Sequence, residues 1–275
     1  MRGIRRPLKA CLSLFKIRLA EQLQYRAAAL ANSTISIFWG ILQIVMFTVF
    51  FTYGNINSAA MTLPQAVSYA WLVQILLGVT GRLDVNGEIR TKIIDGNVAL
   101  ELCRPLDLYA HWYAKTVADQ IGGSFWRMLI TLLAALVMPA ALRLTAPESL
   151  LGFSFFLLSV GSAILLCAAF SMLLSALRVG LTWGDGPTYL LALTGQVLSG
   201  AYLPLQLWPD FMQRALLLQP FAGLIDIPVR LYIGTLPPYD ALPAIALQLL
   251  WAVIFMAAGK VLLGRRISRL IVQGG

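Results

Sequence analysis

Residues 27–81 of this 275-residue chain contain no Asp, Glu, Lys or Arg, and such a run restricts the chain to folds embedded in a membrane. A helix rises about 1.5 Å per residue, so about 20 residues cross the hydrocarbon core of a bilayer. The run is therefore long enough for two crossings. The turn-rich sequence YGNINS at 53–58 separates them and predicts spanning helices over 28–52 and 63–81, with Thr62 as an N-cap.

The amino-acid composition also indicates a membrane protein. The chain is 59% hydrophobic and only 12% charged, whereas soluble domains average about 25% charged residues. Its formal net charge is +9. The basic residues gather near the chain ends and in one loop, which favours membrane topology over nucleic-acid binding. We therefore expect contact with the lipid bilayer and none with nucleic acid.

Further apolar stretches complete an all-α integral membrane fold of six transmembrane helices, in a single domain of residues 1–275. The four remaining spans are expected over 120–142, 150–177, 186–203 and 241–263. Arg127 would lie near the start of the third span and reach the interface. Residues 1–26 contain leucines at helical spacing over 8–24. They predict an amphipathic helix on the membrane surface, or else the end of the first span.

The distribution of basic residues predicts the orientation. With six spans, 18 of the 21 Lys and Arg side chains fall on one side of the membrane, which places both termini in the cytosol. The same count makes residues 82–119 a cytosolic segment. Its core, GEIRTKIIDGNVALELCRPLDLYAHWYAK at 87–115, is the longest polar stretch between apolar blocks. This segment either contacts a soluble partner or merely connects two helices.

Residues 204–240 are apolar but contain prolines at 204, 209, 220, 228, 237 and 238. They are broken too often for a straight span. Irregular backbone exposed to lipid would leave N–H and C=O groups unsatisfied, so we expect short re-entrant helices packed at the outer membrane face.

A stripe of small residues recurs at every fourth position of the fourth predicted span. It predicts a face for close helix packing, with a polar substrate path as the alternative. Its members are Ser159, Ala163, Cys167, Ser171 and Ser175.

Residues for several kinds of chemistry are missing. The three cysteines are far apart and His111 is the only histidine, so no metal site is expected. The sequence has no phosphate-binding loop of the form GxxxxGK[ST], and no catalytic or cofactor-binding residues stand out. Few ionisable residues fall inside the spans, which argues against an ion-driven carrier. A translocation unit that draws its energy from another protein remains.

Two motifs carry a family resemblance. Ser199-Gly200 followed by Pro204, Pro209 and Pro220 resembles the "SG…P…P…P" pattern of ABC type-2 permeases, the membrane subunits of ATP-binding-cassette exporters. The stretch Gly96–Pro105, GNVALELCRP, resembles the Gly-x-(Ile/Val)-x-x-x-Leu-x-Arg-Pro pattern that one branch of these permeases carries between spans two and three. Leu102 occupies the leucine position.

The resemblance implies a transport subunit and not an enzyme. This chain would pair with a second permease subunit, identical or homologous, above a dimer of cytosolic ATPases. ATP and Mg would be bound by those partner subunits, with no cofactor on this chain. Such permeases move varied cargo, including drugs, peptides and lipids, and we expect this one in a bacterial inner membrane. The alternatives are a secondary carrier or a membrane scaffold subunit that is not coupled to ATP, and, as a third class, a membrane-embedded enzyme.

Two groups of residues are expected to serve this function. The first would couple the permease to the ATPase, although Arg104 has the alternative role of a lipid-headgroup anchor. The second would form an outer gate, or else a static cap within an aromatic belt. The coupling residues are Glu88, Arg90, Asp95, Gly96, Arg104 and Pro105, and the outer gate residues are Tyr202, Pro204, Trp208, Pro209, Phe211 and Pro220.

Overall fold

The computed structural model describes residues 16–17, 20–21, 26–53, 61–81, 83–95, 107–179 and 185–267 of the chain. All regular elements in these ranges are helices, which confirms the all-α class. The amphipathic helix predicted over 8–24 falls largely outside the described residues. The same is true of the predicted coupling residues Gly96, Arg104 and Pro105.

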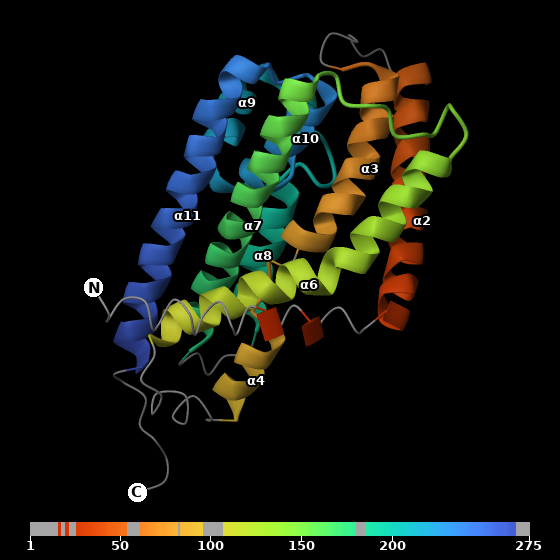
Figure 1. The fold of residues 1–275 in the computed structure, drawn as a ribbon. Helices are drawn as coiled ribbons and strands as arrows, with labels where there is room; N and C mark the ends of the chain where they lie inside the picture. The colour runs from red at the N-terminus through yellow and green to blue at the C-terminus, as the bar shows by residue number, and fades with distance from the viewer. Residues whose placement is uncertain are drawn as a thin grey trace, which may run out of the picture.

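Five helices of the described ranges are long and apolar enough to cross a membrane. Four of them run side by side, and α6 crosses the bundle at a slant (Figure 1). They are α2 (Arg26–Tyr53), α3 (Leu63–Thr80), α6 (Leu108–Val137), α7 (Leu150–Arg178) and α11 (Pro238–Ile267).

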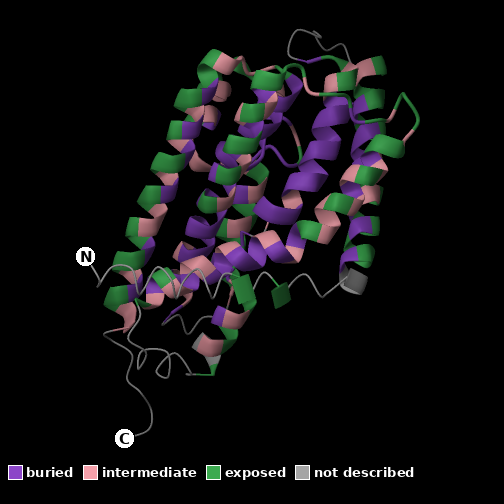
Figure 2. Ribbon diagram, in the orientation of Figure 1, coloured by how far each residue is buried: buried purple, intermediate pink, exposed green. Residues whose placement is uncertain are grey.

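Helix α3 forms the centre of the bundle. Thr62 precedes it as the sequence predicts. A capping box with Gln65 provides hydrogen-bond partners for backbone N–H groups at the start of the helix. The side chains of Tyr69 and Trp71 are completely buried, and Figure 2 shows α3 as buried along most of its length. An apolar helix with no exposed stripe must be surrounded by other helices, so α3 is the element on which the rest of the bundle packs.

The third predicted span is wrong at both ends. The structure starts α6 at Leu108 instead of 120, because the Asp107 carboxylate caps the helix by accepting a 2.9 Å hydrogen bond from the Ala110 backbone. The helix also ends at Val137 instead of 142. Arg127 consequently lies well inside a 30-residue helix and not near its start.

The fifth predicted span, 186–203, is also corrected. Helix α8 (Gly186–Leu198) has only 13 residues and ends before Gly200, which has a φ of +86°. At about 1.5 Å per residue this is about 20 Å, too short to cross a hydrocarbon core of about 30 Å. The apolar sequence continues beyond the helix, but the backbone turns.

The region of repeated prolines consists of short helices, in agreement with the sequence. They are η1 (Leu205–Leu207), α9 (Asp210–Leu218), η2 (Pro220–Leu224) and α10 (Asp226–Ile233). Helices α9 and α10 lie at the end of the bundle opposite to α4 (Gly87–Ile94) (Figure 1). The last long helix begins three residues earlier than predicted, at Pro238.

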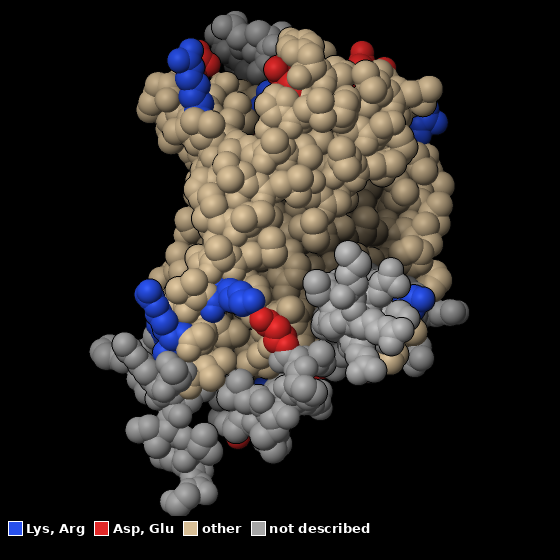
Figure 3. Space-filling view, turned by 60° about the vertical axis from the view of Figure 1, so that its left-hand side comes forward, with Lys and Arg blue, Asp and Glu red and all other residues tan. Residues whose placement is uncertain are grey.

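One face of the molecule shows how charged side chains are distributed along it. On the face drawn in Figure 3, Lys, Arg, Asp and Glu lie near the upper and lower ends, and a broad uncharged belt separates them. An apolar belt between two charged ends is the surface that a bilayer-spanning protein requires.

Candidate functional site

Helix α4 is an amphipathic helix attached to one end of the bundle. The Asn86 side-chain oxygen accepts hydrogen bonds from the backbone N–H groups of Glu88 (3.2 Å) and Ile89 (3.4 Å), which fixes the first turn. The Ile89 side chain is fully buried. It belongs to a cluster formed by α6, α7 and α11, whose members include Tyr109, Trp112, Met172, Ala176 and Leu263. One side chain of α4 thus contacts the packing core of three spanning helices.

Ion pairs join α4 to α6. Glu88 pairs with Lys92 one turn later at 3.0 Å, and with the buried Lys115 of α6. Partial burial opposes ionisation of Glu88, but the hydrogen bonds from Lys115 and Lys92 outweigh it and lower the pKa of Glu88 to about 2. The carboxylate is therefore charged at neutral pH and holds both lysines.

A second set of ion pairs joins α4 to the end of α7 and the start of α8. The Nε atoms of Arg90 and Arg178 donate to the two carboxylate oxygens of Asp185, over 2.9 Å and 2.7 Å. The hydrogen bond from Arg90 in particular holds the pKa of Asp185 below its ordinary value. At the same end of the bundle, the Lys260 ammonium lies 2.8 Å from the Asp107 carboxylate.

The predicted coupling residues that the structure describes are therefore gathered on α4 and the turn after it. Glu88 and Arg90 form the ion pairs above, and Asp95 is exposed. No local pattern in the sequence indicated Lys115 and Asp185 as the partners of these charges, because both lie far away along the chain.

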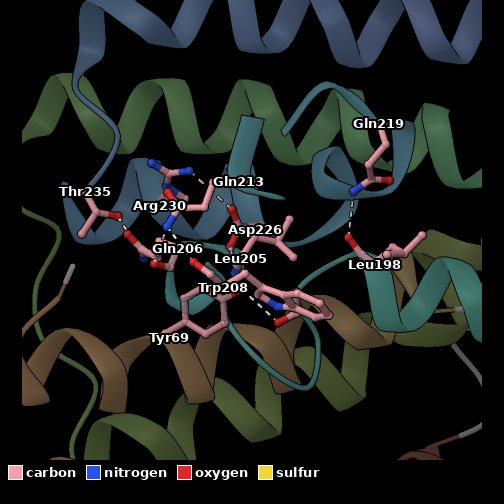
Figure 4. A network of polar contacts seen from close by, with 11 residues as sticks. Tyr69, Leu198, Leu205, Gln206, Trp208, Gln213, Gln219, Asp226, Arg230 and Thr235 are labelled. Atoms are coloured by element: carbon pink, nitrogen blue, oxygen red, sulfur yellow. Dashed lines mark hydrogen bonds and ion pairs between the residues drawn. The ribbon is translucent and has the colours of Figure 1, made fainter. Parts of the chain in front are cut away.

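At the other end of the bundle, a buried polar network surrounds Asp226, which has no exposed surface. Its Oδ1 accepts a hydrogen bond from the Leu205 backbone at 3.0 Å and lies 3.0 Å from the Tyr69 hydroxyl. That hydroxyl is also 2.9 Å from the Gly200 carbonyl oxygen. Arg230 lies 3.7 Å from Oδ2, one helical turn away (Figure 4). The network fastens α3, the turn after α8 and α10 to one another.

The structure explains the glycine of the SG motif. Gly200 has a φ of +86°, and a Cβ at this position would lie 2.6 Å from the Tyr69 hydroxyl oxygen and 3.1 Å from Asp226 Cβ. A side chain at position 200 is unfavourable for two reasons: the positive φ strains any residue other than glycine, and the neighbouring atoms leave no space for a Cβ.

We expect Gly200→Ala to lower the free energy of unfolding by about 1–3 kcal/mol or more, because it adds backbone strain and a clash. Gly161→Ala is the matched control, since a Cβ there meets nothing within 4 Å. It lies inside α7, so the control should be neutral or stabilising by up to about 1 kcal/mol. Unfolding in detergent measures both variants, and a Gly200→Ala protein as stable as wild type would contradict this explanation.

The six predicted outer gate residues occupy different environments. Pro204 and Pro209 stand directly before η1 and α9, and Pro220 begins η2, so each proline starts a short helix. Tyr202 and Phe211 are exposed by 54% and 83%, whereas Trp208 is half-buried. Their role as a gate stays a prediction.

The small-residue stripe of α7 lies inside the chain. All five of its residues are buried. The Ser159 hydroxyl and the Gln248 amide of α11 exchange hydrogen bonds of 2.9–3.1 Å. The Cys167 thiol donates to the Thr80 carbonyl at the end of α3 over 3.2 Å. The stripe thus packs against helices of its own chain.

Sequence reasoning missed two features. One is the Asp226 network, which an Asp four residues before an Arg in an apolar segment could have indicated. The other is the depth of Arg127, which the sequence placed near the start of a span and which lies well inside α6. No cluster of three or more His, Cys, Asp or Glu side chains placed to bind a metal occurs in the described ranges.

Comparison with known proteins identifies the family. A search of curated proteins found no match. The family model of the ABC-2 family transporter protein matches residues 37–274, from the first spanning helix almost to the end of the chain. This match covers most of the sequence and agrees with the five apolar spanning helices. The chain therefore belongs to the ABC-2 family of membrane transport proteins.

Proposed function

We propose that the chain is the permease subunit of an ATP-binding-cassette exporter, driven by separate cytosolic ATPase subunits that bind ATP and Mg. The attachment of α4 is the observation that carries this proposal. Its Ile89 is buried among side chains of three spanning helices, and its Glu88 and Arg90 pair with Lys115 and Asp185. A short helix fastened in this way transmits a displacement to the bundle instead of absorbing it.

In this mechanism α4 and the residues that follow it, as far as Arg104 and Pro105, dock on an ATPase. Closure of the ATPases on ATP displaces the docked segment. The displacement reaches α6 through Lys115 and Ile89, and α7 through Asp185 and the same apolar cluster. The exposed Asp95 and the outward side of α4 supply contacts to the partner.

The six-span topology forms part of this proposal. Helix α8 and the turn that follows it would make the fifth crossing together, with the short helices 205–233 re-entering from the outer face. Burial of Asp226 and of the backbone around it supports this arrangement, because polar groups at membrane depth need protein partners. Both termini would then face the cytosol, in a bacterial inner membrane.

A second permease subunit would complete the translocation path. Several large apolar side chains of α2 and α8 are exposed in the single chain, among them Trp39, Leu42, Tyr189 and Leu190. Apolar residues on a spanning helix face either lipid or another subunit. The exposed residues of α2 and α8 therefore offer surface for a second permease as well as for lipid.

A secondary carrier is the second candidate, and Arg127 is the observation that favours it, since ionisable residues within spans often belong to ion-coupled transport. The rate of ATP hydrolysis discriminates between the ATP-driven permease and the secondary carrier. Adding this permease to its co-purified ATPase in proteoliposomes should change the hydrolysis rate severalfold relative to the ATPase alone. Cargo movement that needs no ATPase and stops when ion gradients are collapsed would establish the carrier.

A further inference from the structure

A cavity of about 580 Å³ lies between α2, α3 and α6, beside the turn that follows α8. Part of its wall is apolar and comes from Trp39, Leu42 and Met46 of α2, together with Leu77 of α3. These three α2 side chains are each about half exposed, at 48–53%. The cavity therefore has an apolar flank on the outer side of a spanning helix.

Arg127 gives this cavity its single positive charge. It is the only charged side chain among the described residues of the lining, which include neither Asp nor Glu. Its Nε donates a 2.9 Å hydrogen bond to the Ser36 hydroxyl, which holds the guanidinium against α2. A cation at this depth of a spanning helix is costly and marks a functional position. The planar guanidinium fork suits phosphate and carboxylate groups.

Amide side chains provide further polar contacts. The Gln43 amide donates to the carbonyl groups of Ala201 (3.3 Å) and Tyr202 (3.5 Å), so it fixes the far wall of the cavity. Gln74 is 8% exposed and also lines the cavity. Its side-chain amide has no hydrogen bond to any described residue. An amide on the cavity wall can donate hydrogen bonds to a ligand with oxygen atoms.

We infer that this cavity binds an amphiphile with an anionic headgroup, whose phosphate or carboxylate lies at Arg127 and whose acyl chain lies along the apolar flank of α2. The volume agrees with this occupant, because ligand cavities of about 300–1,000 Å³ accept molecules of this size. An anion matches the charge of the wall, and the half-exposed α2 side chains match a chain that reaches the bilayer. The occupant is either a resident lipid or the cargo, and only the second role rests on the proposed function.

Native mass spectrometry of the purified full chain tests this inference directly. Dioleoyl phosphatidic acid and dioleoyl phosphatidylcholine, with identical chains, are added in parallel. We expect preferential retention of the phosphatidic acid. Arg127→Gln should reduce that preference about tenfold or more, because it removes a charge-assisted hydrogen bond. Arg127→Lys should restore part of it.

Arg143→Gln is the matched control, because it removes the same charge from an exposed loop position and should leave retention unchanged. Leu42→Trp enlarges a side chain of the apolar flank and leaves the positive charge in place, so it should reduce binding of both lipids. Equal retention of the two lipids by wild type, or unchanged preference in Arg127→Gln, would overturn the inference. The experiment contains no ATPase, so its result is independent of ATP coupling.

A second measurement separates the two sources of the ligand. Proteoliposomes that contain the permease and its ATPase are supplied with a fluorescent phosphatidic acid. ATP-dependent movement of this probe between leaflets, lost in Arg127→Gln, identifies the amphiphile as cargo. No ATP-dependent movement, together with the preferential retention seen by mass spectrometry, identifies a resident lipid.

Discussion

Replacing Asp226 with Ala is expected to lower the free energy of unfolding by about 3–5 kcal/mol. The carboxylate is completely buried, and its loss leaves the mostly buried Arg230 without this ion pair and the Leu205 N–H without its acceptor. The Tyr69 hydroxyl would also lose one of its two acceptors. Equilibrium unfolding in mixed detergent micelles, with increasing sodium dodecyl sulfate, measures the loss.

Two further variants make this prediction specific. Asp240→Ala removes an exposed carboxylate at the start of α11 and should cost less than about 1 kcal/mol. The double variant Asp226→Leu with Arg230→Met replaces both charges by apolar groups and should recover much of the lost stability. If Asp226→Ala lowers the free energy of unfolding no more than Asp240→Ala does, the buried network does not hold α3, α10 and the turn after α8 together.

Ile89→Ala is expected to uncouple the permease from its ATPase. The change removes the one fully buried side chain among the described side chains of α4, and leaves a cavity that costs about 2–5 kcal/mol. This loss falls on the attachment of α4, because Ile89 packs against side chains of the spanning helices. Permease-dependent ATP hydrolysis should fall about tenfold or more, since an attachment weakened by more than 1.4 kcal/mol shifts its population tenfold.

Val253→Ala is the control for this variant. It shortens an apolar side chain of α11 that is 56% exposed, so it should change neither ATP hydrolysis nor assembly. The ATPase should still bind to Ile89→Ala, since the outward side of α4 is unchanged. Wild-type hydrolysis by a folded Ile89→Ala complex would contradict coupling through α4.

Local signals in the sequence predicted much of the fold. The turn-rich sequence after Tyr53 and the cap at Thr62 placed two spanning helices, and their observed bounds differ from the predicted ones by no more than two residues. The prolines at 204, 209 and 220 predicted short helices because each of them starts an element. These signals depend only on neighbouring residues, so a single sequence contains them.

The errors have physical causes that lie outside local sequence. Helix α6 extends to Leu108 because tertiary contacts accommodate polar residues that an apolar window excludes, such as the buried Lys115 paired with Glu88. Helix α8 ends before Gly200 because Tyr69 and Asp226, from two other helices, occupy the space around the turn. The Arg127 cavity requires three helices and a turn to meet, and no spacing along the chain reveals it.

Mass spectrometry of the proteins that co-purify with this chain from its native membrane, in mild detergent, tests the central claim most directly. The ATP-driven account predicts a soluble subunit that carries a GxxxxGK[ST] motif, in near one-to-one amount with the permease chains. The same experiment identifies the second permease as identical or different. Recovery of this chain alone, stable and able to move cargo without an ATPase, would contradict the account and establish a carrier.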